Sequence, residues 1–289
     1  MSKLRDALQS GRFVVTAEIA PPKGVDISEM LDSAHLLRDR VTAVNVTDQQ
    51  SSVMRLGSLA ACHLLADNGV ETVFQMTTRD RNRIALQSDL LSAYVMGIEN
   101  VLCLTGDYVT LGDHPHAKPV FDLESVGLLR AAKQLERGSD MSEKPLKGAP
   151  KFFLGAVVTP GANPLEPQLF KMEKKVAAGA QFFQTQAVYE PSRFESFMQY
   201  ARQFKVPVLA GIIPLKSAGM ARFMNNNVAG VYVPEALIEE ISKADDKYRK
   251  SLEITARLIN QIRPMCDGVH VMAIGWERKV PDILDAAGL

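Results

Sequence analysis

Residues 13–24 read FVVTAEIAPPKG, and this stretch decides between two ways of building an α/β protein. A β-branched, apolar run reaches Glu18 and then passes into a Pro-Pro turn. An open, doubly wound sheet that binds a dinucleotide would show GxGxxG here, where glycines let a helix start approach the phosphates. The end of the first predicted strand therefore favours a barrel over an open dinucleotide-binding sheet.

Short apolar runs alternate with longer amphipathic segments along the rest of the chain. Most runs are apolar nearly throughout, as strands buried on both faces of a parallel sheet are. Several amphipathic segments stop at a glycine, namely Gly97, Gly138 and Gly179, which is typical of helix C-terminal caps. Eight such strands in 289 residues predict a single-domain (β/α)8 TIM barrel over residues 1–289. The expected strands are 13–19, 43–47, 72–76, 100–104, 152–158, 182–186, 208–213 and 268–274, and the polar residues 138–151 are expected to form an exposed loop.

Composition excludes several classes of protein. The 33 basic and 33 acidic residues cancel, which argues against a nucleic-acid partner. The N-terminal residues contain no apolar h-region, and no apolar run approaches the roughly 20 residues that span a bilayer, so a cytoplasmic protein without a membrane segment is expected. The cysteines at 62, 103 and 266 stand far apart and are interpreted as buried free thiols. His114 and His116 lie in a Pro-rich loop and are interpreted as solvated, so no metal is predicted in this chain.

Polar side chains close most of the predicted strands. Because active sites of such barrels form at the carboxyl ends of the strands, these residues should converge on one mouth. Neither a Cys–His pair nor a GxSxG nucleophile elbow occurs among them. Their amides and hydroxyls suit hydrogen bonding to a heteroaromatic ring, which favours cofactor chemistry over nucleophilic catalysis. The strand-end residues are Glu18, 47–50, 75–78, 105–107, 159–161 and 184–186.

At these positions the sequence resembles the methylenetetrahydrofolate reductase family, in its barrel-only bacterial form. The resemblance covers nearly the whole chain, and it depends on the order and spacing of its motifs rather than on any one of them. The motifs are VVTAEIAPPKG (14–24), VTAVNVTDQQ (41–50), LTGD (104–107), KKVAAGAQFFQTQ (174–186), AGIIPL (210–215) and GVHVMAIG (268–275).

The resemblance implies an FMN-dependent enzyme, with FAD as the second choice, that reduces 5,10-methylenetetrahydrofolate to 5-methyltetrahydrofolate. Glu18 matches the carboxylate implied to help protonate N10 of the folate. Asp107 matches the aspartate that lies near the flavin and binds the pterin ring. Both are therefore expected to be catalytic and to bind substrate. Gln186 matches a glutamine that contacts the folate and the nicotinamide. The positions implied to contact the cofactor are Thr47, Gln75, Thr105, Gly106, Asp107, Thr159, Asn163 and Lys175.

The chain departs from the family pattern at several of these positions. The family often has His, Arg, Tyr and His where this chain has Gln75, Thr105, Thr159 and Asn163, and an aromatic residue that stacks on the substrate is missing near Ala218. These departures weaken the expected nicotinamide platform. The electron donor is accordingly expected to be NAD(P)H or a partner subunit with an iron–sulfur cluster, in an oligomer or a heteromeric complex. Three scattered cysteines cannot ligate such a cluster, which needs about four thiolates, so the cluster would belong to another protein.

Two alternatives to the reductase remain open at this point. One is a flavin-free, pterin-binding barrel that transfers a methyl group, because it would also use an aspartate and amides to bind the pterin. The other is a barrel without catalysis that serves as an assembly subunit. The visible spectrum separates them from the reductase, since only the reductase would purify with a bound flavin.

Overall fold

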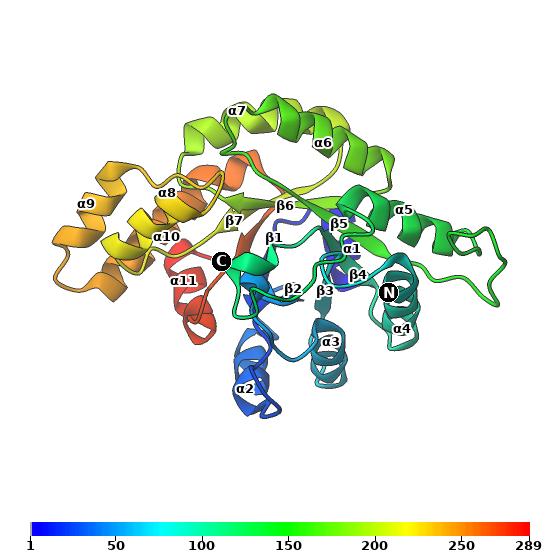
Figure 1. Ribbon diagram of the computed structural model, residues 1–289. Helices are drawn as coiled ribbons and strands as arrows, with labels where there is room; N and C mark the ends of the chain where they lie inside the picture. The colour runs from blue at the N-terminus through cyan, green and yellow to red at the C-terminus, as the bar shows by residue number, and fades with distance from the viewer. Residues whose placement is uncertain (1) are drawn as a thin grey trace.

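The computed structural model of the protein describes residues 2–289. Within them, eight parallel strands pair in sequence order and β8 pairs with β1, which closes the sheet into a barrel (Figure 1). The prediction of a (β/α)8 barrel is confirmed, and the expected strands lie within a few residues of the observed ones. The strands are β1 (Val14–Ile19), β2 (Ala43–Val46), β3 (Thr72–Thr77), β4 (Asn100–Leu104), β5 (Phe153–Val158), β6 (Phe182–Ala187), β7 (Val208–Ile212) and β8 (Gly268–Val271).

Helices surround the barrel, and most follow one strand and precede the next (Figure 1). The predicted glycine caps are confirmed, because Gly97, Gly138 and Gly179 follow α4, α5 and α6 with φ of 79°, 86° and 109°. Three helices, α8 to α10, lie between β7 and β8. The helices are α1 (Lys3–Gln9), α2 (Ser28–Leu37), α3 (Ser58–Asp67), α4 (Arg83–Val95), α5 (Ser125–Glu136), α6 (Glu166–Ala177), α7 (Pro191–Ala201), α8 (Ala218–Asn227), α9 (Glu235–Lys243), α10 (Lys247–Ile262) and α11 (Val280–Ala287).

Helix α1 closes the N-terminal end of the barrel. The Ser2 side chain caps the helix by accepting a hydrogen bond from the Arg5 backbone N–H at 3.0 Å. Leu4 and Leu8, which are one helical turn apart, pack with the first inward-facing residues of the strands. Burial of each leucine contributes about 1.5–3 kcal/mol. Figure 1 shows α1, in blue, behind the strands and opposite the mouth that faces the viewer.

The interior of the barrel changes from apolar to polar along the strands. Side chains two residues apart on a strand face the same side, so Val14, Thr16 and Glu18 of β1 follow one another from the closed end to the mouth. The lower layer around α1 consists of apolar side chains, namely Val14, Ala43, Val73, Leu102, Phe153, Phe182 and Leu209. The next layer contains buried polar side chains, namely Thr16, Asn45, Gln75, Gln184 and His270. A layer of buried polar side chains therefore lies directly beneath the mouth.

Several smaller predictions concern the periphery of the barrel. Cys62 and Cys103 are buried free thiols, as expected, whereas Cys266 is half-buried. Burial raises the pKa of Cys103 to about 12 and that of Cys266 to about 11. Residues 138–151 form the predicted loop. Among residues 2–289, no group of three or more His, Cys, Asp or Glu side chains is placed to hold a metal ion. None of the helices in that range is long and apolar enough to cross a membrane.

Candidate active site at the barrel mouth

A cavity of about 380 Å³ opens at the carboxyl ends of the strands. Strands β1, β3, β4, β5 and β6 each contribute a predicted site residue to its walls, either from the strand itself or from the turn that follows it. Residues that are far apart in sequence, such as Glu18 and Gln186, therefore face one space. The predicted residues that line this cavity are Glu18, Gln75, Thr105, Gly106, Asp107, Thr159, Lys175 and Gln186.

Two of the residues implied to contact the cofactor lie elsewhere. Thr47 lines a second cavity of about 420 Å³, which lies between the loop after β1 and the segment after β8. The two cavities share Glu18 and Gln50. Its hydroxyl is buried and has no hydrogen-bond partner within residues 2–289. Asn163 is exposed in the loop after β5 and lines neither cavity. The structure therefore separates these two residues from the main group.

Glu18 is held by three side chains from different parts of the fold. Its Oε1 accepts a hydrogen bond from Gln75 Nε2 at 3.1 Å and lies 3.4 Å from His270 Nε2. Its Oε2 accepts from Gln50 Nε2 at 3.3 Å. Only 8% of the residue is exposed, so the carboxyl group lies in the wall of the cavity rather than in bulk water. A carboxyl group in this position can exchange a proton with a ligand in the cavity.

Gly106 and Asp107 form the turn after β4. Gly106 has φ of +92°, and a Cβ built on it would lie 3.1 Å from Thr77 Cβ and 3.2 Å from Arg79 Cβ. Glycine thus permits both the turn and the close approach. The Asp107 carboxylate makes no salt bridge within residues 2–289 and is exposed at the cavity. It is therefore available to a ligand.

Lys175 places a buried amine in the wall of the cavity. Its Nζ donates a hydrogen bond to the Val157 carbonyl at 2.6 Å, and 6% of the residue is exposed. Burial first, and the nearby Lys171 charge second, lower the pKa of Lys175 to about 8. Lys171 and Gln168 line the same cavity from one face of α6. This face of α6 therefore places two lysine side chains at the cavity.

Arg79 was not predicted as a site residue, and it is buried although it follows β3 in the polar segment TTRDR. Its guanidinium binds the Asp80 carboxylate, with Nη2 at 2.7 Å from Oδ2, and it also donates to the Gln49 and Asp107 carbonyls at 3.4 and 3.3 Å. It thus ties together the turns after β2, β3 and β4 below the mouth. The density of charges in this segment was the only available signal, and it equally suits a solvated loop.

Asp48, one of the polar residues predicted at the strand ends, has a structural role. Its buried carboxylate accepts from the Thr77 backbone N–H at 2.8 Å and from the Thr77 hydroxyl at 2.9 Å. Arg81 Nη1 lies 2.8 Å from the same carboxylate. Thr77 and Arg81 both belong to the segment at the end of β3, so Asp48 fixes the end of β2 to β3.

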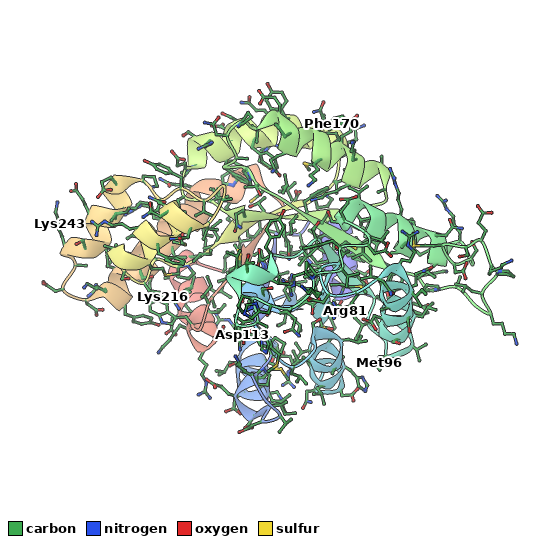
Figure 2. The ribbon with its side chains drawn as sticks, in the orientation of Figure 1. Arg81, Met96, Asp113, Phe170, Lys216 and Lys243 are labelled. Carbon is green, nitrogen blue, oxygen red and sulfur yellow. The ribbon has the colours of Figure 1, made fainter. Side chains whose placement is uncertain are left out.

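A strap formed by residues 107–121 crosses the mouth between β4 and α5. Asp113 joins this strap to the loops after β1 and β2, because its carboxylate binds Lys23 Nζ and accepts from the Met54 backbone N–H at 3.0 Å. The bonds from Lys23, His114 and Met54 hold the pKa of Asp113 well below its ordinary value. Figure 2 shows Asp113 in front of the barrel, in the view toward the mouth. The strap therefore covers the side of the mouth nearest β1 and β2.

Comparison with known proteins identifies the family. The model of the methylenetetrahydrofolate reductase family matches residues 3–288. Methylenetetrahydrofolate reductase 2 of Schizosaccharomyces pombe is 26% identical over 311 residues, which cover 99% of this chain and 47% of that protein. A probable methylenetetrahydrofolate reductase (NADPH) of Caenorhabditis elegans is 24% identical over 246 residues, which cover 80% of this chain and 34% of that protein. The chain thus spans about half the length, or less, of these relatives.

Solved structures agree on the fold. A Clostridium thermocellum protein described as binding two copies of 5-methyl-5,6,7,8-tetrahydrofolic acid superposes with a TM-score of 0.68 at 14% identity, over 98% of this chain and 97% of its own. The coenzyme F420 dependent tetrahydromethanopterin reductase of Methanopyrus kandleri gives a TM-score of 0.57 at 11% identity, over 94% and 97%. At these identities the likeness concerns the fold alone. The family match extends over nearly the whole chain, and the chain belongs to the methylenetetrahydrofolate reductase family.

Proposed function

We propose that this barrel reduces 5,10-methylenetetrahydrofolate to 5-methyltetrahydrofolate with a bound flavin, FMN being the first choice and FAD the second. The observation that carries the proposal is the position of Glu18. The chain belongs to the reductase family, and its Glu18 places a carboxyl group in the wall of a cavity that Gln75, Asp107 and Gln186 also line. An acid, an unpaired carboxylate and amides around one space match what this reduction requires.

The residues of the cavity fit a flavin. Amide and hydroxyl groups from Gln75, Thr105 and Thr159 can hydrogen-bond to its polar ring edge, although the Thr105 hydroxyl already accepts from the Ser125 backbone N–H at 3.2 Å. Gly106, which has no side chain, lets the backbone approach a planar ring closely. Lys171 and Lys175 together suit the phosphate group of FMN. When it is bound, the flavin supplies the hydride.

The substrate requires three further groups from the protein. Asp107 and Gln186 would bind the pterin, through a carboxylate that accepts hydrogen bonds and an amide that donates or accepts them. Glu18 would lie at N10 of the folate. As the bond between N10 and the methylene carbon breaks, Glu18 gives its proton to N10, and the methylene carbon remains as an iminium at N5 of the folate.

The charge that develops on the substrate explains a carboxylate at position 107. An iminium carries a positive charge, and the exposed Asp107 carboxylate, which makes no salt bridge within residues 2–289, would stabilise it electrostatically. Hydride addition to the methylene carbon then gives the methyl group. One hydride and one proton are consumed for each folate, which balances the reaction. Glu18 takes up a proton from solvent before the next turnover.

The electron donor is NAD(P)H or an iron–sulfur partner subunit, and the partner is our working hypothesis. The names of the relatives in Caenorhabditis elegans and Oryza sativa specify NADPH and NADH. In this chain, however, Ala218 stands at the start of α8, where an aromatic side chain would offer a stacking surface. Mixing the purified protein with NADH under anaerobic conditions tests the hypothesis, because rapid bleaching of the flavin would eliminate the need for a partner. We also propose that the protein assembles into an oligomer or a heteromeric complex and that it is cytoplasmic.

The visible spectrum of the purified protein tests the proposed function. Absorption in the bands of oxidised flavin, with FMN released on denaturation, is the expected result. A colourless protein that does not take up FMN on reconstitution would contradict the proposal. In that case, binding of 5-methyltetrahydrofolate would favour the methyltransferase, and failure to bind a folate would favour the assembly subunit.

A further inference from the structure

A chain of hydrogen bonds beneath the cavity ends at Glu18. It begins with Asn45 and Gln184, whose amides face each other across the barrel with N···O distances of 2.8 and 3.1 Å. Gln184 Nε2 also lies 3.3 Å from Thr16 Oγ1. Thr16 Oγ1 is 2.9 Å from His270 Nδ1, and His270 Nε2 is 3.4 Å from Glu18 Oε1.

The five residues of this hydrogen-bond network come from four strands, and all five are nearly excluded from solvent. Thr16 and Asn45 are 0% exposed, Gln184 is 1% exposed and His270 is 2% exposed. Buried polar groups in such an environment must satisfy one another, because no water replaces a lost partner. The hydrogen-bond directions are therefore set by the network as a whole.

With the amides of Asn45 and Gln184 oriented as in the structure, those directions indicate one tautomer of His270. The reciprocal pair of Asn45 and Gln184 uses one N–H and the carbonyl of each amide, which leaves the second N–H of Gln184 to donate to Thr16 Oγ1. The Thr16 hydroxyl then donates to His270 Nδ1, which lies 2.9 Å from that oxygen. With Nδ1 as the acceptor, a neutral imidazole carries its hydrogen on Nε2, which faces Glu18.

We infer that His270 is a positioning residue for Glu18, held by Thr16 in the tautomer whose Nε2–H donates to Glu18 Oε1. The inference rests on the proposed role of Glu18 as the acid. Gln75 Nε2 donates to the same oxygen at 3.1 Å, so two fixed donors occupy Oε1. Within residues 2–289, the one hydrogen bond to Oε2 comes from Gln50, a half-buried residue of the loop after β2, at 3.3 Å. The proton that Glu18 gives to the folate therefore resides on Oε2.

The two donors to Oε1 stabilise Glu18 most after its proton has been transferred to the folate. The carboxylate that remains accepts both N–H groups at Oε1 without any movement of the barrel, and hydrogen bonds to a charged acceptor are stronger than those to a neutral one. Donors that are already in place lower the barrier because they need no reorganisation during the reaction. His270 thus acts through Glu18, with no contact to the reacting atoms assigned to it.

Two amide substitutions separate a positioning role from a structural one. His270→Gln brings an amide N–H near the position of Nε2, whereas the shorter side chain of His270→Asn reaches only the position of Nδ1. We expect His270→Asn to lower kcat of folate reduction by about 10- to 100-fold with KM unchanged. His270→Gln should retain most of the wild-type kcat. Equal losses in the two variants, or a change confined to KM, would contradict the inference.

The tautomer itself can be measured without any variant of the site. In protein labelled with ¹⁵N-histidine, the nitrogen chemical shifts distinguish a protonated Nε2 from a protonated Nδ1. The signal of His270 is assigned in the wild-type protein by its through-space contact with Thr16, whose Oγ1 lies 2.9 Å from His270 Nδ1. We expect a neutral imidazole with the hydrogen on Nε2. A hydrogen on Nδ1 would overturn the assignment even if every variant failed to fold.

Substitutions of Thr16 test the direction of the hydrogen bonds in this network. Thr16→Val removes the hydroxyl and keeps the β-branched shape, so we expect a mixture of His270 tautomers and a lower kcat. Thr16→Ser keeps the hydroxyl and should therefore retain the single tautomer and the wild-type kcat. Thr255 is a second buried threonine, whose hydroxyl donates to the Ser251 carbonyl on α10, and Thr255→Val should leave the His270 signal and kcat unchanged. An unaltered tautomer in Thr16→Val would contradict the role of Thr16.

Failure of the inference and failure of the proposed function give different results. If Glu18→Gln reduces the folate at the wild-type rate, the role of Glu18 is wrong, and with it the proposed mechanism. If Glu18→Gln is inactive while His270→Asn is as active as the wild type, only the role of His270 is wrong.

Discussion

The two ends of the barrel interior are built from the same strands but have opposite chemistry. At the closed end, seven apolar residues of the strands pack with Leu4, Ala7 and Leu8 of α1. Two to four residues further along the same strands, the inward-facing side chains include Thr16, Glu18, Gln184 and Gln186. The change occurs within about 7–13 Å, given a rise of roughly 3.3 Å per residue.

The difference shows how the barrel separates stability from function. Apolar contacts at the closed end need no directional partners, so that end can tolerate changes of side chain that preserve volume. The polar layer above it depends on hydrogen bonds with fixed donors and acceptors, and each lost partner leaves a buried group unsatisfied. Substitutions at the closed end should therefore change the free energy of unfolding, and substitutions at the mouth should change binding and catalysis.

The largest effect is expected at the mouth, for Glu18→Gln. Loss of a general acid lowers the rate by roughly 10²- to 10⁴-fold, because the N10 amine then leaves without a proton. Oxidation of the chemically reduced flavin by methylenetetrahydrofolate should slow by this factor, as followed by anaerobic stopped-flow absorbance. Reduction of the flavin by its donor should remain intact. Glu143→Gln, in the exposed loop 138–151, is the control and should change neither step.

The closed end is tested by Phe182→Ala. Phe182 is fully buried and stacks on Phe153 with ring centroids 4.9 Å apart, and its ring fills the space beside Gly155, where a Cβ would lie 2.2 Å from Phe182 Cζ. Removing the ring should lower the free energy of unfolding by roughly 3–5 kcal/mol, as measured by urea titration. The folded variant should bind flavin as the wild type does, since the ring lies in the apolar layer.

An exposed phenylalanine provides the comparison. Phe223 on α8 is 61% exposed, and Phe223→Ala should change the stability by no more than about 0.5 kcal/mol. Loss of flavin from folded Phe182→Ala would show that the two ends of the barrel are coupled, contrary to the separation described above.

A smaller effect is expected for Gly106→Ala, in the turn beside the cavity. At φ of +92°, with Thr77 Cβ and Arg79 Cβ at 3.1 and 3.2 Å from the new Cβ, the substitution should cost about 1–3 kcal/mol. Because the strain falls at the mouth, we expect weaker FMN binding, as measured by fluorescence titration. Gly219→Ala is the control, since its new Cβ would lie 3.8 Å from Ser217 Oγ, which is an ordinary contact distance. Equal FMN affinity in Gly106→Ala and the wild type would exclude close contact between this turn and the cofactor.

The smallest effect concerns the charge of Lys175, whose pKa is lowered to about 8 by burial and by Lys171. Lys175 is protonated below that pH, so FMN affinity should decrease by about tenfold as the pH rises through 8. Riboflavin, which has no phosphate, should show no such change, and Lys175→Met should abolish it. A riboflavin affinity with the same pH dependence would contradict the assignment of Lys175 to the phosphate.

The same pKa has the opposite consequence for the stability of the protein without cofactor. In the unfolded chain the lysine has a pKa near 10.5, so between about pH 8 and 10.5 the unfolded state binds more protons than the folded state. The contribution of Lys175 to the free energy of unfolding therefore increases as the pH rises through this window.

The sequence predicted the fold well because local patterns carry it. Apolar runs of strand length, amphipathic segments between them and glycines at the helix ends are readable without tertiary contacts, and eight alternations leave few architectures. The same logic located the mouth, since Glu18, Gln75, Asp107 and Gln186 end their strands and meet at one cavity. That part of the site follows from topology alone.

The polar layer beneath the mouth could not be predicted in this way. Thr16 and His270 are isolated polar residues inside apolar strands, and they are 254 positions apart in the chain. Their contact depends on the pairing of β1 with β8 and on the register of the closed barrel, which places Thr16 opposite His270. The exposure of Asn163 and the location of Thr47 at the second cavity likewise depend on loop conformations that no local pattern specifies.

The most direct test of the central claim is a single half-reaction in the wild-type protein. The protein loaded with FMN is reduced with dithionite, freed of excess reductant and mixed anaerobically with 5,10-methylenetetrahydrofolate. The account predicts that the oxidised-flavin absorption returns and that one 5-methyltetrahydrofolate forms for each flavin oxidised. Flavin that stays reduced in the presence of the bound folate, with no methyl product, would contradict it.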